Sequence, residues 1–81
     1  RVLLVEDHLI NQEIASSMLR TLGCSVTVAG DGTEAVDAVA RQRFDLVFMD
    51  CLMPTMDGFE ATRRIRALGH TELPILAMAA S

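Results

Sequence analysis

Apolar and polar residues follow one another in blocks along the chain, and two kinds of pattern alternate. Residues 1–6 (RVLLVE) hold a continuous apolar run, which is typical of a strand buried on both faces. From there to Leu22 the apolar residues recur with the period of a helix, and Gly23 follows where a left-handed C-terminal cap is favoured. This pattern predicts a strand and then an amphipathic helix. The apolar positions of that helix are Ile10, Ile14, Ala15, Met18, Leu19 and Leu22.

The next blocks repeat the alternation. Residues 25–29 (SVTVA) form a short run rich in β-branched side chains, which favours a second strand. Asp31 and Glu34 then fit the capping box that begins a helix. Residues 45–50 (DLVFMD) place an apolar segment between two acids and predict a third strand. The second helix is expected to bury Ala35, Val36, Val39 and Ala40.

The last blocks predict a third helix and a fourth strand. Asp57 and Glu60 suit the start of the helix, which is expected to end at Gly69. Residues 75–80 form an apolar run after Pro74 and predict the strand. The positions expected to point inward on the third helix are Phe59, Thr62, Ile65 and Leu68.

Strands that alternate with helices through short connections are parallel and joined by right-handed crossovers. The expected fold class is α/β, a doubly wound parallel sheet with helices on both faces. The chain shows no repeat, linker or low-complexity segment, so residues 1–81 are expected to form a single domain. If the first and third strands are neighbours, the strand order is 2-1-3-4.

Three carboxylates stand where the predicted strands end. Glu6 and Asp7 follow the first strand, and Asp50 closes the third. Ligands of open α/β sheets bind beyond the carboxyl ends of the strands, where the strand order reverses. Acids that converge there repel one another unless a cation intervenes, and Mg²⁺ prefers such oxygen ligands. An Asp at this place can act as a nucleophile and form an acyl phosphate.

The charge balance argues against a nucleic-acid surface. The net charge is −4, no Lys is present, and Arg63, Arg64 and Arg66 are expected on the solvated side of a helix. No apolar run is long enough to cross a bilayer, and no leader peptide opens the chain. Cys24 and Cys51 are expected at opposite ends of the sheet, about 15 Å apart and too far for a disulfide. These features favour a cytoplasmic, reducing setting.

Four stretches of the chain carry motifs in a fixed order. They are residues 2–8 (VLLVEDH), 30–36 (GDGTEAV), 45–58 (DLVFMDCLMPTMDG) and 74–80 (PILAMAA). Together they span nearly the whole chain, and the chain resembles the receiver (response-regulator) family of two-component signalling. Residues 6–15 (EDHLINQEIA) further resemble receivers attached to hybrid sensor histidine kinases. The resemblance implies a flavodoxin-like sheet and a place in a phosphorelay.

The resemblance also implies a role for each acid. Asp50 is the expected phosphoacceptor, Asp7 a direct Mg²⁺ ligand and Glu6 a ligand through water, and the backbone carbonyl of Leu52 is a further metal ligand. The donor is expected to be a phosphohistidine on a histidine kinase or a histidine phosphotransfer domain. This segment is then a phosphoacceptor rather than a free-standing enzyme, and it contacts neither nucleic acid nor membrane. The parent chain can be a hybrid histidine kinase, with or without a membrane anchor, or a free regulator.

Departures from the family's pattern leave a second function open. Ala79 stands where the family has a Thr or Ser at the end of the fourth strand. The family's fifth-strand Lys cannot lie in a chain without Lys, and the last helix-strand-helix part of the family is not found. The domain is therefore expected to be incomplete at its C-terminus. The alternative to an active phosphoacceptor is a degenerate receiver, a protein-interaction module with weak or no phospho-switching.

Several of these residues also have a plainer interpretation. Asp7 can serve as the N-cap of the first helix instead of, or together with, metal binding. His8 is expected to be solvated, and Asp57 is expected to be a structural cap. An aspartyl-phosphate phosphatase needs a second acid where Leu52 stands, so this class is set aside.

The first helix has a wider apolar arc than packing on a sheet requires. We hypothesise that its flank near Ile10 and Ile14 docks the helical bundle that carries the donor histidine.

Overall fold

The computed structural model describes residues 1–50 and 57–78, and its elements alternate as predicted. Strands and helices follow one another from the first strand to the fourth, with boundaries within a few residues of those expected. The elements are β1 (Val2–Val5), α1 (Leu9–Thr21), β2 (Val26–Ala29), α2 (Gly32–Arg41), β3 (Leu46–Asp50), α3 (Gly58–Ala67) and β4 (Ile75–Met78).

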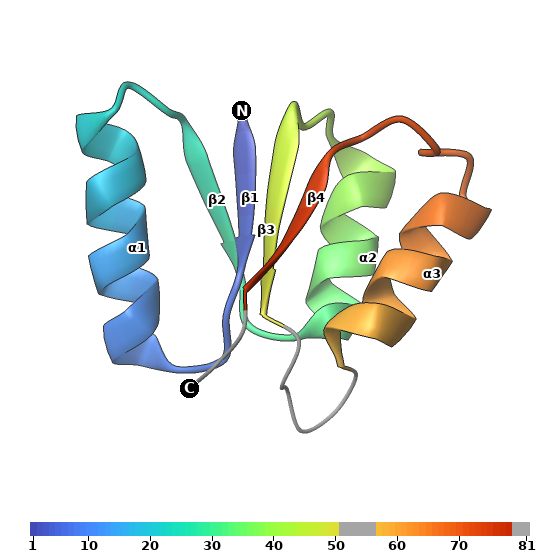
Figure 1. Ribbon diagram of the computed structural model, residues 1–81, viewed down its shortest axis with the longest axis horizontal. Helices are drawn as coiled ribbons and strands as arrows, with labels where there is room; N and C mark the ends of the chain where they lie inside the picture. Colours follow the sequence, from blue (N-terminus) through green and yellow to red (C-terminus); the bar gives the residue numbers. More distant parts are fainter. Residues whose placement is uncertain (51–56, 79–81) are drawn as a thin grey trace.

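The described strands form one parallel sheet in the order β2-β1-β3-β4 (Figure 1). β1 lies between β2 and β3, and its last residue, Val5, pairs with Ala29 on one side and Met49 on the other. The strand order reverses at β1 and β3, so the carboxyl ends of these two strands meet where such sheets bind ligands. The predicted α/β class and the order 2-1-3-4 are confirmed.

Helices cover both faces of the sheet, but unequally. Figure 1 shows α1 on one side and α2 with α3 on the other. Leu3 and Leu4 point to opposite faces of β1 and are both 0% exposed, so that burial of each contributes about 1.5–3 kcal/mol. The core under α2 and α3 consists of Leu3, Val5, Ala29, Ala35, Val39, Val47, Met49, Ala61 and Ile65.

α2 and α3 begin with the predicted caps. Oδ1 of Asp31 accepts a hydrogen bond from the backbone N–H of Glu34 at 2.8 Å, and Oδ1 of Asp57 accepts one from Glu60 at 2.8 Å. Each bond satisfies an N–H group that has no partner within the helix. The Glu34 carboxylate in turn accepts from the backbone N–H of Gly30 at 3.0 Å.

The predicted glycine caps are also confirmed. Gly23 follows α1 and Gly69 follows α3, with φ of +91° and +102°. Because this region is unfavourable for a residue with a Cβ, both positions favour glycine.

The prediction for the inner faces of α2 and α3 is wrong in part. Phe59 and Leu68 are 71% and 51% exposed, whereas Ala61 and Ile65 are both 0% exposed. α3 packs beside α2 as well as on the sheet, and a small residue such as Ala61 allows that close approach. On α2, Ala40 is exposed rather than buried.

The arginines of α3 divide into two groups. Arg63 and Arg64 are exposed and form ion pairs with Glu60. The hydrogen bond from Arg64, and after it the one from Arg63, holds the pKa of the Glu60 carboxyl below its usual value. Arg66 is partly buried and donates to the carbonyls of His70 at 2.7 Å and Leu73 at 2.6 Å. The expectation of a wholly solvated basic face is therefore wrong for Arg66, which fixes the turn before β4.

α1 turns apolar side chains toward solvent. Ile10, Ile14 and Met18 are 73%, 55% and 64% exposed, and their spacing of four residues places them in one row along the helix. Ser16, which is 4% exposed, lies on the side toward the sheet. Among the described residues, no helix combines the length and apolar character needed to cross a membrane.

Candidate functional site

Two buried carboxylates end neighbouring strands. Glu6 follows Val5 of β1, Asp50 follows Met49 of β3, and Val5 pairs with Met49. The register therefore puts Glu6 and Asp50 at matching positions at the carboxyl end of the sheet. They are 7% and 3% exposed, a degree of burial that a carboxylate rarely reaches unless donors or a cation compensate its charge.

The start of α1 holds Glu6 in place. Its Oε1 accepts a hydrogen bond from the backbone N–H of His8 at 3.1 Å and lies 3.5 Å from Nδ2 of Asn11. The Glu6 backbone N–H donates to the carbonyl of Ala29 at 3.0 Å, and the Glu6 carbonyl accepts from Nε2 of Gln12 at 2.6 Å. Both the main chain and the side chain of Glu6 are thus fixed by neighbours on β2 and α1.

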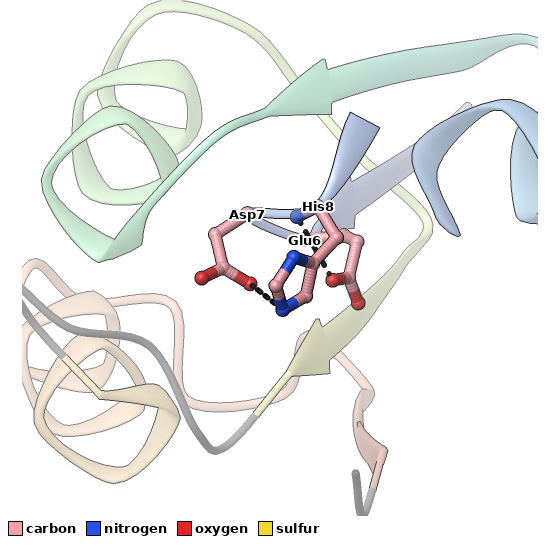
Figure 2. Close-up of side chains that lie close together, drawn as sticks. All are labelled: Glu6, Asp7 and His8. Atoms are coloured by element: carbon pink, nitrogen blue, oxygen red, sulfur yellow. Dashed lines mark hydrogen bonds and ion pairs between the residues drawn. The ribbon is translucent and has the colours of Figure 1, made fainter. Parts of the chain in front are cut away.

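Asp7 has a buried oxygen that accepts no hydrogen bond from any residue the structure describes. Within the described part of the chain, Oδ1 of Asp7 makes no hydrogen bond; Nε2 of His8 lies 3.9 Å away, which is an ion-pair distance when the imidazole is protonated (dashed line in Figure 2) but beyond hydrogen-bond distance. A buried anionic oxygen in this state is destabilising unless a cation compensates it. Asp7 does not cap α1, because the N-cap residue is His8.

The residues present fit a divalent cation. One ligand atom each from Glu6, Asp7 and His8 lies within 4.8 Å of the other two. Figure 2 shows the imidazole between the two carboxylates. A hard ion such as Mg²⁺ prefers carboxylate oxygens, and the unpartnered Oδ1 of Asp7 offers one. The His8 side chain is 73% exposed, so the predicted solvated histidine lies at the rim of this cluster.

Other predicted residues fall into two classes. Asp57 caps α3, as predicted for a structural residue. Leu52 and Ala79 lie outside the described residues, as does Cys51.

Sequence reasoning missed Asn11 and Gln12, which contact Glu6 from the first turn of α1. One signal was present: two adjacent side-chain amides follow the acid pair at the start of a helix whose nearby positions are largely apolar. These amides are neutral and do not offer a cation the charge of a carboxylate, but they can orient the carboxylates that bind it.

The model of the response regulator receiver domain matches residues 2–81 of the chain. The chain belongs to this family. This receiver domain is 48% identical over 73 residues to hybrid signal transduction histidine kinase B of Dictyostelium discoideum. The aligned part covers 90% of this chain and 4% of that protein. It thus spans a small part of this curated relative. The predicted resemblance to receivers of hybrid kinases is confirmed.

Solved structures share the fold of this receiver domain. One is the receiver domain of sensor histidine kinase PA1611 from Pseudomonas aeruginosa, which has a magnesium ion coordinated in its active site cleft. It is 48% identical to this chain with a TM-score of 0.90, and the match covers 94% of this chain and 63% of that chain. The receiver domain of Ssk1 from Saccharomyces cerevisiae was crystallised with the histidine phosphotransfer protein Ypd1. It is 34% identical to this chain with a TM-score of 0.82, and the match covers 96% of this chain and 60% of that chain.

Proposed function

We propose that this receiver domain accepts a phosphoryl group on Asp50 from a phosphohistidine, with Mg²⁺ as cofactor. One observation carries the proposal: the pairing of β1 with β3 brings buried Asp50 to the same sheet edge as Glu6, and beside Glu6 the Oδ1 of Asp7 accepts no hydrogen bond from any described residue. A carboxylate at such a site can be a nucleophile.

Asp7 and Asp50 are the proposed direct ligands of Mg²⁺, with Glu6 acting through water and the backbone carbonyl of Leu52 completing the set. The ion found in the active site cleft of the Pseudomonas aeruginosa receiver supports Mg²⁺ as the cation. Bound Mg²⁺ neutralises charge on the phosphoryl oxygens. Glu6 is held by donors from α1, so its orientation is set before an ion arrives.

The transfer is a substitution at phosphorus. An oxygen of the Asp50 carboxylate forms the new O–P bond while the N–P bond of the phosphohistidine breaks, and the electron pair of that bond stays on the imidazole nitrogen. In the reacting phosphohistidine the second ring nitrogen carries a proton, so the products are an acyl phosphate on Asp50 and a neutral histidine on the donor. No proton needs to leave Asp50, because the carboxylate is the reactive form.

A histidine phosphotransfer domain or histidine kinase is the proposed donor. The Saccharomyces cerevisiae receiver crystallised with such a phosphotransfer protein supports this class of partner. On this chain the row formed by Ile10, Ile14 and Met18 is exposed, and it lies on the helix that starts beside Glu6 and Asp7. We propose that this row docks the donor's helices. The setting is cytoplasmic, whether the parent chain is a hybrid kinase or a free regulator.

A degenerate receiver remains the second candidate function, and a specific observation favours it. Ala79 replaces the hydroxyl residue of the family's pattern, and a methyl group cannot donate a hydrogen bond to a phosphoryl oxygen. Loss of one such contact removes about 1–3 kcal/mol of differential stabilisation. Asp50 is then still modified but couples weakly to conformation.

The test is the intact mass of the protein after incubation with acetyl phosphate and Mg²⁺. We expect one phosphoryl group on the wild type and none on Asp50→Ala. Asp37→Ala is a matched control, because Asp37 is an exposed acid paired with Arg41 on α2. Equal modification of Asp50→Ala and the wild type would overturn the assignment of Asp50. Amide spectra of the modified and free forms then separate the two candidates, since a degenerate receiver changes little on modification.

A further inference from the structure

Gln12 ties the first turn of α1 to the end of β1. Its Nε2 lies 2.6 Å from the carbonyl oxygen of Glu6, and the contact is partly buried. The Glu6 N–H donates to Ala29 of β2, so the Glu6 carbonyl faces the same strand, and it lies beyond the last residues in register between β1 and β2, Val5 and Ala29. The side chain of Gln12 therefore supplies the hydrogen bond that the neighbouring strand no longer supplies.

This hydrogen bond fixes the peptide unit that leads into Asp7. The Glu6 carbonyl and the Asp7 N–H belong to one planar group, so holding the carbonyl sets the direction in which the chain reaches the Cα of Asp7. The preceding peptide unit is already held, because the Glu6 N–H donates to Ala29 of β2 at 3.0 Å. With both peptide units anchored, the Cα of Asp7 is held at the sheet edge.

Electrostatic repulsion makes such an anchor necessary. Glu6 and Asp7 are adjacent acids, and Asp50 lies at the matching position of the next strand. Without a cation, these like charges favour rotation of Asp7 outward into water. Its Oδ1 is nevertheless buried and without a donor among the described residues. The backbone near Asp7 thus resists the repulsion, and Gln12 is the side chain that holds it.

We propose that Gln12 is a positioning residue for the cation site, holding Asp7 where it can bind the ion. The inference rests on the proposed function, since it requires a divalent cation at Asp7. Gln12 touches neither the ion nor the phosphoryl group. Mutation of a residue that hydrogen-bonds to a metal ligand typically lowers metal affinity about 10- to 100-fold. Gln12 acts on the peptide unit that precedes the proposed ligand, Asp7.

The experiment compares Gln12→Met with Gln42→Met by Mg²⁺ titration followed through amide chemical shifts. Met keeps the length of the side chain but removes the donor. Gln42 is exposed at the C-cap of α2, at the opposite end of the sheet from Glu6, so its variant controls for the same chemical change. We expect the Kd for Mg²⁺ to rise about 10-fold in Gln12→Met and to stay within about twofold in Gln42→Met.

Further measurements separate positioning from a structural tie. At saturating Mg²⁺, Gln12→Met should regain modification by acetyl phosphate, because the ion then holds Asp7 in place. If Gln12→Met lowers the Tm of the metal-free protein but leaves the Kd for Mg²⁺ unchanged, the proposal is overturned and Gln12 only stabilises the fold. If Gln12→Met does not fold, Gln12→Ala serves instead, because Ala favours the helix. Wild-type protein that binds no Mg²⁺ would overturn the proposed function and this inference together, whereas equal binding by wild type and variant overturns this inference alone.

Discussion

The described helices begin in two different ways. α2 and α3 each start with an Asp, Asp31 or Asp57, whose side chain accepts an N–H of its own helix. α1 starts at His8, which makes no side-chain cap, and the N–H of His8 is bound by Glu6 from the end of β1. The start of α1 is therefore held by Glu6 at the strand end. Similar carboxylates thus have different roles: Asp31 and Asp57 stabilise the fold as caps, whereas the buried Oδ1 of Asp7 accepts no hydrogen bond from the part of the chain that the structure describes and can bind a cation.

The outer surfaces of α1 and α3 differ as well. α3 carries Glu60 between Arg63 and Arg64, a charged network that suits contact with water. α1 carries the exposed row of Ile10, Ile14 and Met18 instead. Contiguous apolar surface of this kind marks interaction sites, which is why we propose docking on α1.

The largest expected effect comes from Asp7→Asn, which tests the contrast between binding and capping acids. Removing a direct ligand should weaken Mg²⁺ binding at least about 100-fold, more than loss of a supporting residue does. Without metal the same variant should be more stable by about 1 kcal/mol, raising Tm by about 4–8 °C, because a neutral amide removes a partly buried charge whose Oδ1 accepts no hydrogen bond from the described residues. Metal titration and thermal melting measure the two effects. A metal-free Tm below that of the wild type would mean that the Asp7 carboxylate stabilises the fold.

The next effect concerns the outer surface of α1. Ile14→Asp places a charge in the proposed docking row and should slow phosphoryl transfer from a phosphohistidine donor about 30-fold, the effect of losing a central interface contact of about 2 kcal/mol. Modification by acetyl phosphate, which needs no docking, should be unchanged. Leu68→Asp is the matched control, since Leu68 is 51% exposed and Ile14 is 55% exposed. Equal losses with both phosphoryl donors would refute docking through this row.

The smallest expected effect is that of Asp57→Ala, which removes a helix cap. The variant should lose about 1 kcal/mol of stability, with or without Mg²⁺, because the N–H of Glu60 loses its acceptor. Denaturant unfolding in the presence and absence of Mg²⁺ measures this loss. A change in the Kd for Mg²⁺ as large as that of Asp7→Asn would show that Asp57 belongs to the cation site and that the contrast drawn between the two kinds of acid is wrong.

Much of the fold was predictable because local signals agree with the overall arrangement. The apolar run of β1 indicates a strand buried on both faces, and Leu3 and Leu4 are indeed buried on opposite faces. Asp31 and Asp57 cap their helices through hydrogen bonds to the residue three positions later, and a contact so close along the chain can be read from the sequence. The placement of Glu6 and Asp50 at the same edge of the sheet followed from the strand order, which parallel crossovers restrict to few alternatives.

The errors concern contacts between elements that no local pattern contains. Phe59 looked like an inner residue because it is large and apolar, but α3 also packs beside α2, and that second contact selects small Ala61. Asp7 matched an N-cap by residue type, yet the chain enters α1 one residue later, at His8. The bond from Gln12 to the Glu6 carbonyl depends on the angle between α1 and β1, which helical periodicity does not specify.

α1 has an apolar row on its solvent side and, from its first turn, an amide bonded to the strand end that carries the acids. One rigid element thus touches both places where this domain is proposed to bind something. Thermodynamic linkage then imposes equality: any factor by which the docked donor alters the dissociation constant of the ion is the factor by which the ion alters the dissociation constant of the donor. Measuring either binding reaction with and without the other component therefore yields a single number for the coupling between the two.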